Sequence, residues 1–412
     1  MKSTKKIARR INGLNWVKVG RWIQAPLFAW SNITGRSREF NLKTLGFDFE
    51  YQNFLFLNSE YHFEESENEK LKEFFNQNLK DDANWFRKYE AIVRDVSQSM
   101  IDFSAQHKDK DFSKFSAGQL KELFQEFYLR VNLAQPVLEG YQLLGELLEA
   151  RIRANLEDYF SRANKKPDLI DEYLKYLNVP KHKIAMVQEE EDFLSLVAKM
   201  QLEHLTITSR EFRSLFDEHL EKYRWISTHH FIGDPYDEQF FWRRLEEHSN
   251  SDCTRELKRR YDQSKSYLRK HEALKAELSK EKDILSDIEI AQDLSYLKPF
   301  RVEAYYIAWT NLWGLFSEIS KRLGIANEDL MALTDTEIVQ AIDTGVVNKA
   351  KINERKKDFA IVKLDGQLEI FSGNSLKEIK SKLHQDDHSG ETHVTGAMAY
   401  EGRVIGLSLI HI

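Results

Sequence analysis

Apolar residues recur at helical spacing through most of the chain. Leu71, Phe74 and Leu79, for example, fall on one face of a helix. Similar segments follow as far as Gly324, a residue type that ends helices because it adopts the left-handed conformation without strain. No fixed repeat period is visible, which argues against a solenoid. The pattern therefore predicts an irregular helical domain over residues 64–333.

The first 63 residues follow a different pattern. Aromatic and β-branched residues dominate from position 16 to position 63, and Pro26, Gly35 and Gly46 interrupt them. This composition is typical of short strands joined by turns. We therefore expect residues 1–63 to form a β-rich cap on the helical domain.

The pattern changes again after the helical region. The segment LTDTEIVQAI begins with Thr334, which is suited to cap a short helix, and the apolar runs DFAIVKL and QLEIFSG flank Asp365-Gly366, a dipeptide favoured in tight hairpin turns. The helix NSLKEIKSKL and the glycine-punctuated stretch THVTGAMAYEGRVIG follow. We expect a hairpin, a helix and the start of a small α/β domain over residues 334–406. The expected fold class is mainly α, with this domain and the β-rich cap at its two ends.

The charge balance offers no general attraction for nucleic acid or anionic lipid. The 412 residues include 66 acidic and 60 basic ones, so the formal charge is −6. A single cysteine, Cys253, excludes an internal disulfide and a cysteine-based zinc cluster. No apolar window reaches the roughly 18 residues of a membrane span, and the basic N-terminal residues lack the apolar region of a secretory signal. We expect a cytoplasmic protein without a membrane span.

The densest group of polar and aromatic residues lies between His219 and Trp242, around a turn at Gly233-Asp234-Pro235. Loops of this kind often contact ligands, although aromatic residues with a polar group also serve buried junctions between domains. The adjacent His229 and His230 have no third ligand at metal-binding spacing, so we predict no metal site. The substrate-binding candidates in this stretch are His219, Tyr223, Trp225, Asp234 and Tyr236.

Other candidate features have simpler explanations. The aromatic residues from Tyr305 to Phe316 follow one helical stripe and suit a core, with a stacking surface for bases as the alternative. The acidic run Glu189–Asp192 suits the start of a helix. The sequence contains neither GxxxxGK[ST] nor GxGxxG, so no common nucleotide-binding fingerprint is present. We also find no arrangement typical of a nucleophilic catalytic triad.

The order of segments in the C-terminal third resembles phosphoenolpyruvate-utilising enzymes, the group that includes phosphoenolpyruvate synthase, pyruvate phosphate dikinase and rifamycin phosphotransferase. The matching segments are RLGI, LTDTEIVQAI, INERKKDFAIVKLDGQLEIFSG and TGAMAYEGRVIG, over roughly residues 300–406. They are similar to the linker and the beginning of the swivelling phosphohistidine domain. Upstream, HLEKYRW followed by GDPYDEQ is similar to the helical middle domain of the same group.

The resemblance implies a relay in which a histidine of the swivelling domain carries a phosphoryl group between two sites. The loop with that histidine does not follow here, so we assign no catalytic residue. The resemblance further implies ATP and Mg²⁺ on an ATP-grasp domain, for which residues 1–63 leave no room. That domain is then either a separate partner, which the basic N-terminal residues favour, or part of an N-terminal region that the sequence lacks. Residues 64–333 would hold a small-molecule phosphoryl acceptor. Arg301 and Arg355 are candidates to neutralise phosphate charge, and surface salt bridges explain them equally well.

The last six residues, LSLIHI, match the translation of CTGTCTCTTATACACATC, which resembles a transposase adapter used in sequencing libraries. We therefore expect residues 407–412 to be a scar and the chain to be a truncated, inactive fragment of a phosphotransferase-type protein. For these six residues the alternative is a genuine apolar edge strand, which would leave an unpaired edge. For the protein the alternative is a helical interaction or scaffold protein without catalytic chemistry. Nucleic-acid binding through the aromatic stripe is disfavoured by the acidic charge balance.

Overall fold

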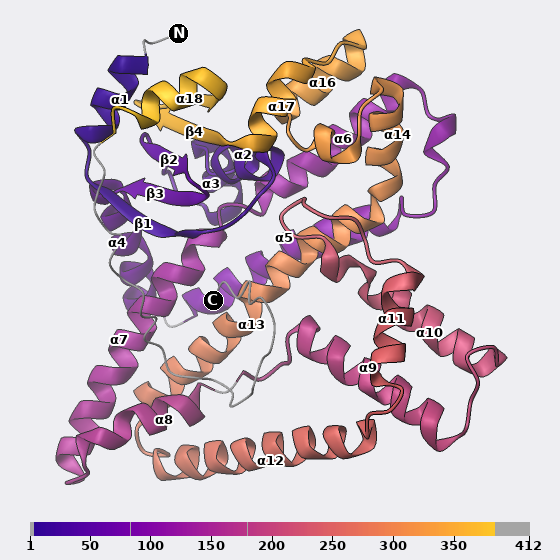
Figure 1. The fold of residues 1–412 in the computed structure, drawn as a ribbon. Coiled ribbons are helices and arrows are strands. Elements are labelled where there is room, and N and C mark those ends of the chain that lie inside the picture. The colour runs from indigo at the N-terminus through magenta and orange to yellow at the C-terminus, as the bar shows by residue number, and fades with distance from the viewer. Residues whose placement is uncertain (1–3, 83, 179, 384–412) are drawn as a thin grey trace. The chain divides into compact units, whose positions relative to one another are not determined.

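The computed structural model describes residues 4–82, 84–178 and 180–383. It is mainly helical with one small antiparallel sheet, which confirms the expected fold class (Figure 1). Within the described residues, no helix is both long and apolar enough to cross a membrane. The predicted β unit in THVTGAMAYEGRVIG and the LSLIHI segment lie outside the described residues.

The chain forms two compact units, and each contains segments that are far apart in the sequence. The first, which we call the sheet unit, comprises the described parts of Met1–Asp82, Lys110–Val137 and Gly314–Ile412. The second, the helical unit, comprises the described parts of Ala83–Asp109 and Leu138–Trp313. The chain therefore alternates between the units instead of completing one before it begins the next.

The sheet unit is built around five antiparallel strands in the order β1-β3-β2-β4-β5. The pairing of β2 with β4 places Leu55 opposite Val362 and so joins the two ends of the described chain. Ile7, Leu55, Val362 and Leu376 share one apolar core, because the first and last helices pack on the sheet. The strands are β1 (Trp16–Arg21), β2 (Phe54–Leu57), β3 (Glu60–Glu64), β4 (Phe359–Leu364) and β5 (Gln367–Ser372).

Two hairpins of the sheet turn through two residues with positive φ, the geometry that matches the twist of paired strands. Asp365 and Gly366, with φ of 51° and 76°, join β4 to β5 and confirm the predicted turn. Asn58 and Ser59, with φ of 54° and 64°, join β2 to β3. The second turn has no glycine, so the sequence signal for it was weak.

The helices of the sheet unit begin and end largely at residues suited to those positions. Ser116 and Gln119 form a reciprocal capping box, and Thr334 and Glu337 form another. The helices are α1 (Thr4–Asn12), α2 (Pro26–Thr34), α3 (Arg38–Leu45), α4 (Glu65–Asp81), α6 (Ala117–Leu133), α14 (Trp313–Leu323), α15 (Asn327–Leu330), α16 (Asp335–Thr344), α17 (Lys349–Lys357) and α18 (Gly373–Lys380), with a short 3-10 helix η1 (Phe112–Lys114).

The structure groups the N- and C-terminal segments differently from the predicted boundaries at residues 63 and 333. Strands β2 and β4 share hydrogen bonds, so the expected cap and the expected new domain are parts of one unit. The prediction of only strands and turns in residues 16–63 was also wrong in part, because α2 and α3 lie there. Pro26 begins α2 at a position where its missing N–H costs nothing, and short apolar runs do not distinguish helix from strand.

A buried ion pair connects α16 and α17. The Arg355 side chain has no exposed surface, and its guanidinium donates to both carboxylate oxygens of Glu337 at 2.5 and 3.0 Å and to the Ala332 carbonyl at 3.0 Å. Lys351 adds a third donor to the same carboxylate at 2.5 Å. Burial alone would raise the pKa of Glu337, but the hydrogen bonds from Arg355 and Lys351 outweigh it and lower that pKa to about 2. Arg355 is thus engaged within the protein.

The helical unit packs around α13, the longest helix of the described chain, which lies along α5 and also contacts α7 (Figure 1). Pro299 lies inside α13 and has no backbone N–H, so the Ser295 carbonyl does not receive the hydrogen bond that residue 299 would normally donate to it. The helices are α5 (Trp85–Ala105), α7 (Leu138–Arg162), α8 (Ile170–Leu177), α9 (Ala185–Leu202), α10 (Arg210–Tyr223), α11 (Glu238–His248), α12 (Cys253–Glu277) and α13 (Lys282–Asn311), with 3-10 helices η2 (Pro167–Leu169) and η3 (Arg224–Ser227).

Two glycines of α7 have opposite surroundings. A β-carbon at Gly140 would overlap the phenol ring of Tyr89, which is buried beneath α7. A β-carbon at Gly145 would meet no atom within 4 Å. Gly140 therefore permits a close helix contact, whereas Gly145 leaves space beside the helix.

We expect Gly140→Ala to destabilise the helical unit by about 1–3 kcal/mol, because the buried Tyr89 ring cannot move aside without repacking. Gly145→Ala is the matched control and should stabilise the unit by about 0.5–1 kcal/mol, because alanine loses less backbone entropy in a helix. Hydrogen exchange of α7 amides measures both effects. Equal changes in the two variants would contradict this account of Gly140.

We expect Glu337→Gln to destabilise the sheet unit by about 3 kcal/mol at pH 7, because Arg355 would keep its charge without a counterion. Since the folded-state pKa of Glu337 is lowered, its stabilising effect is present above about pH 4.5 and is lost as the pH falls toward 2. Hydrogen exchange of α16 and α17 amides at pH 7 and pH 3 tests this difference.

The control for that experiment is Glu328→Gln, which removes a carboxylate paired with Lys356 but 72% exposed. Its effect should stay below about 1 kcal/mol, because water screens exposed ion pairs. A loss in the Glu337 variant that is the same at both pH values would show that the carboxylate charge is not what stabilises α16 against α17.

Candidate functional site

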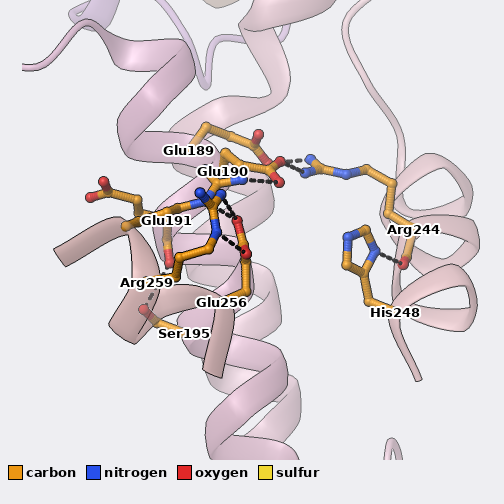
Figure 2. Close-up of polar contacts among 9 residues, drawn as sticks. Glu189, Glu190, Glu191, Ser195, Arg244, His248, Glu256 and Arg259 are labelled. Carbon is orange, nitrogen blue, oxygen red and sulfur yellow. Dashed lines mark hydrogen bonds and ion pairs between the residues drawn. The ribbon is translucent and has the colours of Figure 1, made fainter. Parts of the chain in front are cut away.

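A network of charged side chains connects α9, α11 and α12 in the helical unit (Figure 2). Glu189 accepts hydrogen bonds from the Arg244 guanidinium and, at 3.0 Å, from His219 Nε2. Arg244 also donates to Glu190 at 2.7 Å. Burial would raise the pKa of Glu189, but the hydrogen bonds from His219 and Arg244 lower it. His219, one of the predicted substrate-binding candidates, therefore forms a hydrogen bond with a buried carboxylate.

The network continues onto α12 with alternating charge. Arg260 contacts Glu190 at 3.3 Å and Glu256 at 2.9 Å, and Glu256 also pairs with Arg259 at 2.7 Å. These two arginines lower the pKa of Glu256 to about 2, because their hydrogen bonds outweigh its desolvation. Each carboxylate of this network faces a cation, so the network has no charge left to offer a ligand.

The acidic run does not lie where the sequence pattern placed it. Helix α9 starts at Ala185, so Glu189–Asp192 occupies its second turn and not its first. The carboxylates pair with cations of neighbouring segments, including Lys183 with Glu191 at 2.5 Å and Lys222 with Asp192 at 2.8 Å. Within the described residues, no group of three or more His, Cys, Asp or Glu side chains is arranged to hold a metal ion.

The other candidates between His219 and Trp242 make packing contacts. Tyr223 donates its hydroxyl hydrogen bond to Asp192 at 2.5 Å, and Trp225 donates from Nε1 to the Lys222 carbonyl at 2.8 Å. Tyr236 stacks on the Phe240 ring with centroids 3.5 Å apart. Asp234 is exposed, and its backbone carbonyl accepts from the Ser227 hydroxyl at 2.6 Å. These contacts fit the alternative interpretation of the stretch as a buried junction.

A tight turn at residues 229–232 was not foreseen from the sequence. His229 and Ile232 exchange two backbone hydrogen bonds of 2.8 Å, and the central residues His230 and Phe231 have φ of 49° and 62°. Histidine is found at positive φ more often than most residues, but the bulky Phe231 rarely is, so the turn depends on its surroundings. Phe231 stacks on Trp309 of α13 with centroids 4.5 Å apart. The turn is therefore fixed by packing on α13.

Arg301 on α13 differs from the arginines described above. It is only 3% exposed, and within the described residues no carboxylate forms an ion pair with it. Its Nη1 lies 3.4 Å from the Tyr305 hydroxyl, and its Nε has no hydrogen-bond partner in the described part of the chain. The guanidinium carbon lies 5.2 Å from the Tyr305 ring centre and 5.7 Å from that of Tyr141. Two aromatic rings thus take the place of a counterion.

A pocket of about 240 Å³ lies between α7 and α13. Arg301 does not line it, but Tyr141, whose ring centre lies 5.7 Å from the Arg301 guanidinium carbon, does. Lys298, one turn before Arg301, lies at the pocket and remains exposed. The pKa of Lys298 is lowered, first because the surrounding protein removes water from its ammonium group and then because Arg301 carries a positive charge. The pocket is lined by several apolar residues and by the polar residues and glycine Tyr141, Gly145, Glu149, Asn178, Ser295 and Lys298.

Arg301 is the one predicted site residue in this second group, since the five candidates between His219 and Trp242 lie around the α9–α12 network or the adjoining loop, and Arg355 lies in the sheet unit. Sequence reasoning missed Tyr141 and Lys298. The only local signal was the Lys298-Pro299 pair inside an apolar helical pattern, which marks an interrupted helix without indicating a pocket. A scan against protein-family models and a search of curated proteins find no match for the chain.

We expect Arg244→Met to cost about 3 kcal/mol of stability in the helical unit, because Glu189 would stay buried with His219 as its remaining partner. Arg259→Met is the matched control from the same network, and since Arg259 is 58% exposed it should cost less than about 1 kcal/mol. Hydrogen exchange of α9 and α11 amides measures the difference. Similar losses of stability in the two variants would contradict this account, because they would show that the burial of Arg244 and Glu189 does not make their ion pair harder to remove.

Proposed function

We propose that this chain is the ligand-holding part of a cytoplasmic phosphoryl-transfer system similar to the phosphoenolpyruvate-utilising enzymes. The helical unit holds a small anionic acceptor or its phosphorylated product. The observation that carries the proposal is Arg301, a buried guanidinium for which the described residues supply no carboxylate partner.

The argument rests on the cost of burying a charge. A guanidinium stays protonated at any physiological pH, so it cannot avoid the several kcal/mol of desolvation by losing a proton. The buried Arg355 and the largely buried Arg244 meet this cost with carboxylates. The Tyr141 and Tyr305 rings offset the cost for Arg301 only by about 1–2 kcal/mol. A bound oxyanion would supply the missing counterion, and the fork of donors on arginine matches phosphate and carboxylate.

The resemblance supplies the chemistry in which such an anion takes part. A carrier histidine on a swivelling domain would bring the phosphoryl group to the ligand. The P–N bond of phosphohistidine breaks as a P–O bond to the ligand forms, and the proton of a hydroxyl acceptor passes to the histidine. ATP and Mg²⁺ would act earlier, on an ATP-grasp partner that charges the histidine. The role of this chain's own residues is to hold and orient the acceptor and to neutralise phosphate charge.

The second candidate function is a helical scaffold without catalytic chemistry. It is favoured by α12, a 25-residue helix of which only Cys253 and His271 are buried, and by the complete pairing of the α9–α12 network. A long charged helix of this kind suits a surface that contacts another protein. The two functions differ in whether the chain accelerates movement of a phosphoryl group.

The test uses a swivelling domain from a phosphoenolpyruvate-utilising enzyme, labelled on its histidine with radioactive phosphate, together with a protein-free extract of small metabolites. We expect the label to move into a small molecule only when this chain is present. Arg301→Lys should slow that transfer by about 10- to 100-fold, because lysine keeps the charge but loses the fork of donors.

Lys114→Ala is the control for loss of a positive charge, because Lys114 is 80% exposed and lies in the sheet unit. It should transfer at the wild-type rate. Label that stays on the histidine in the presence of the folded chain would reject the transfer function and favour the scaffold.

A further inference from the structure

We infer that the pocket between α7 and α13 binds a small oxyanion that also carries a hydroxyl or amino group, and that it does not bind a nucleotide. The inference rests on the proposed function for the role of the ligand as phosphoryl acceptor. The binding itself rests only on the contacts of the helical unit.

The pocket is lined by one face of α7 and one face of α13. Tyr141, Gly145 and Glu149 follow each other at intervals of four residues on α7, so they share one face. Lys298 and Arg301 are three residues apart on α13 and likewise share a face. The Tyr141 ring lines the pocket, and the guanidinium carbon of Arg301 lies 5.7 Å from the centre of that ring. The cation is therefore placed next to the pocket by an aromatic side chain of the opposite helix.

The charges around the pocket indicate the chemistry of the ligand. Lys298 and Arg301 form no ion pair with any carboxylate of the described residues, and the pKa of Lys298 is lowered first by desolvation and then by the positive charge of Arg301. An oxyanion placed near both cations would relieve their mutual repulsion. Glu149 is the only acidic residue among those that line the pocket, and it comes from the other helix. Its carboxylate is an acceptor for a hydroxyl or ammonium group at the other end of the ligand.

The size of the pocket favours a small ligand. A volume of about 240 Å³ lies below the roughly 300–1,000 Å³ of pockets that enclose drug-sized molecules. A phosphorylated or carboxylated compound of a few carbon atoms fits within it, whereas a nucleoside triphosphate would extend out of it into solvent. This preference agrees with the absence of a nucleotide-binding fingerprint from the sequence.

Gly145 gives direct access to the pocket from α7. A β-carbon there meets no atom within 4 Å, so a larger side chain can extend into the empty space without straining the helix. Gly145→Leu would therefore fill the pocket while leaving the backbone and the charged residues in place. Gly118→Leu is the control for placing leucine at a helix glycine, because Gly118 is exposed on α6 of the sheet unit and does not line the pocket.

The experiment is calorimetric titration of the whole chain with inorganic phosphate, 3-phosphoglycerate and glycerol. We expect 3-phosphoglycerate to bind more tightly than phosphate, and glycerol not to bind. Gly145→Leu and Lys298→Ala should each weaken binding of 3-phosphoglycerate by about tenfold or more, whereas Gly118→Leu should stay within about threefold of wild type. Glu149→Gln should weaken binding of 3-phosphoglycerate but not of phosphate, since phosphate has no hydroxyl-bearing carbon chain to reach it.

Three results would overturn the inference: no binding of either anion, unchanged binding in Gly145→Leu, or competition by ATP at the same site. The outcome is separable from that of the transfer assay. Binding that Gly145→Leu abolishes, combined with no label transfer, would leave the pocket established and reject the phosphoryl-transfer function. Label transfer that proceeds normally in Gly145→Leu would instead retain the function and reject this pocket as its site.

Discussion

A charge that leaves water must meet an opposite charge or a dense set of hydrogen bonds, and this constraint organises both units. Arg355 is matched by Glu337 in the sheet unit, and Glu189 by Arg244 and His219 in the helical unit. These pairs connect neighbouring helices, α16 with α17 and α9 with α10 and α11. They contribute less net stability than their number suggests, since desolvation cancels much of the attraction, but each makes its partner costly to remove. Among these buried charges and within the described residues, Arg301 is the exception, which is why it indicates a function while the paired groups indicate architecture.

The same constraint explains which parts of the site could be predicted from the sequence. A cluster such as His219, Tyr223 and Asp234 attracts attention because its residue types can do chemistry, yet the structure uses the first two to satisfy Glu189 and Asp192. Pairing of that kind depends on which helices meet, and no local pattern encodes it. Arg301 was among the sequence candidates for phosphate contact, but its isolation from carboxylates became visible only in three dimensions. Tyr141 gave no sequence signal at all, because its role depends on the crossing of α7 and α13.

For the fold, the sequence predicted what depends on neighbouring residues. Helical periodicity, the cap at Thr334 and the turn at Asp365-Gly366 all involve contacts within a few positions, and the structure confirms them. Pairing of β2 with β4 joins segments about 300 residues apart, which no periodicity reveals. The turn at His230-Phe231 also escaped prediction, because stacking on Trp309 and not residue preference fixes it.

The pairing of β2 with β4 also has a consequence for the order in which the chain can fold during synthesis. All four residues of β2 are buried, and one of its edges is covered by β4, which is made only after the entire helical unit. While the ribosome completes that unit, the segment Phe54–Leu57 can pair with β3 but presents an apolar, unpaired edge on its other side. The nascent chain is thus most prone to association with other chains in the interval before β4 emerges. The order of folding that the topology allows is helical unit first and sheet last, although the sheet contains the first residues to be made.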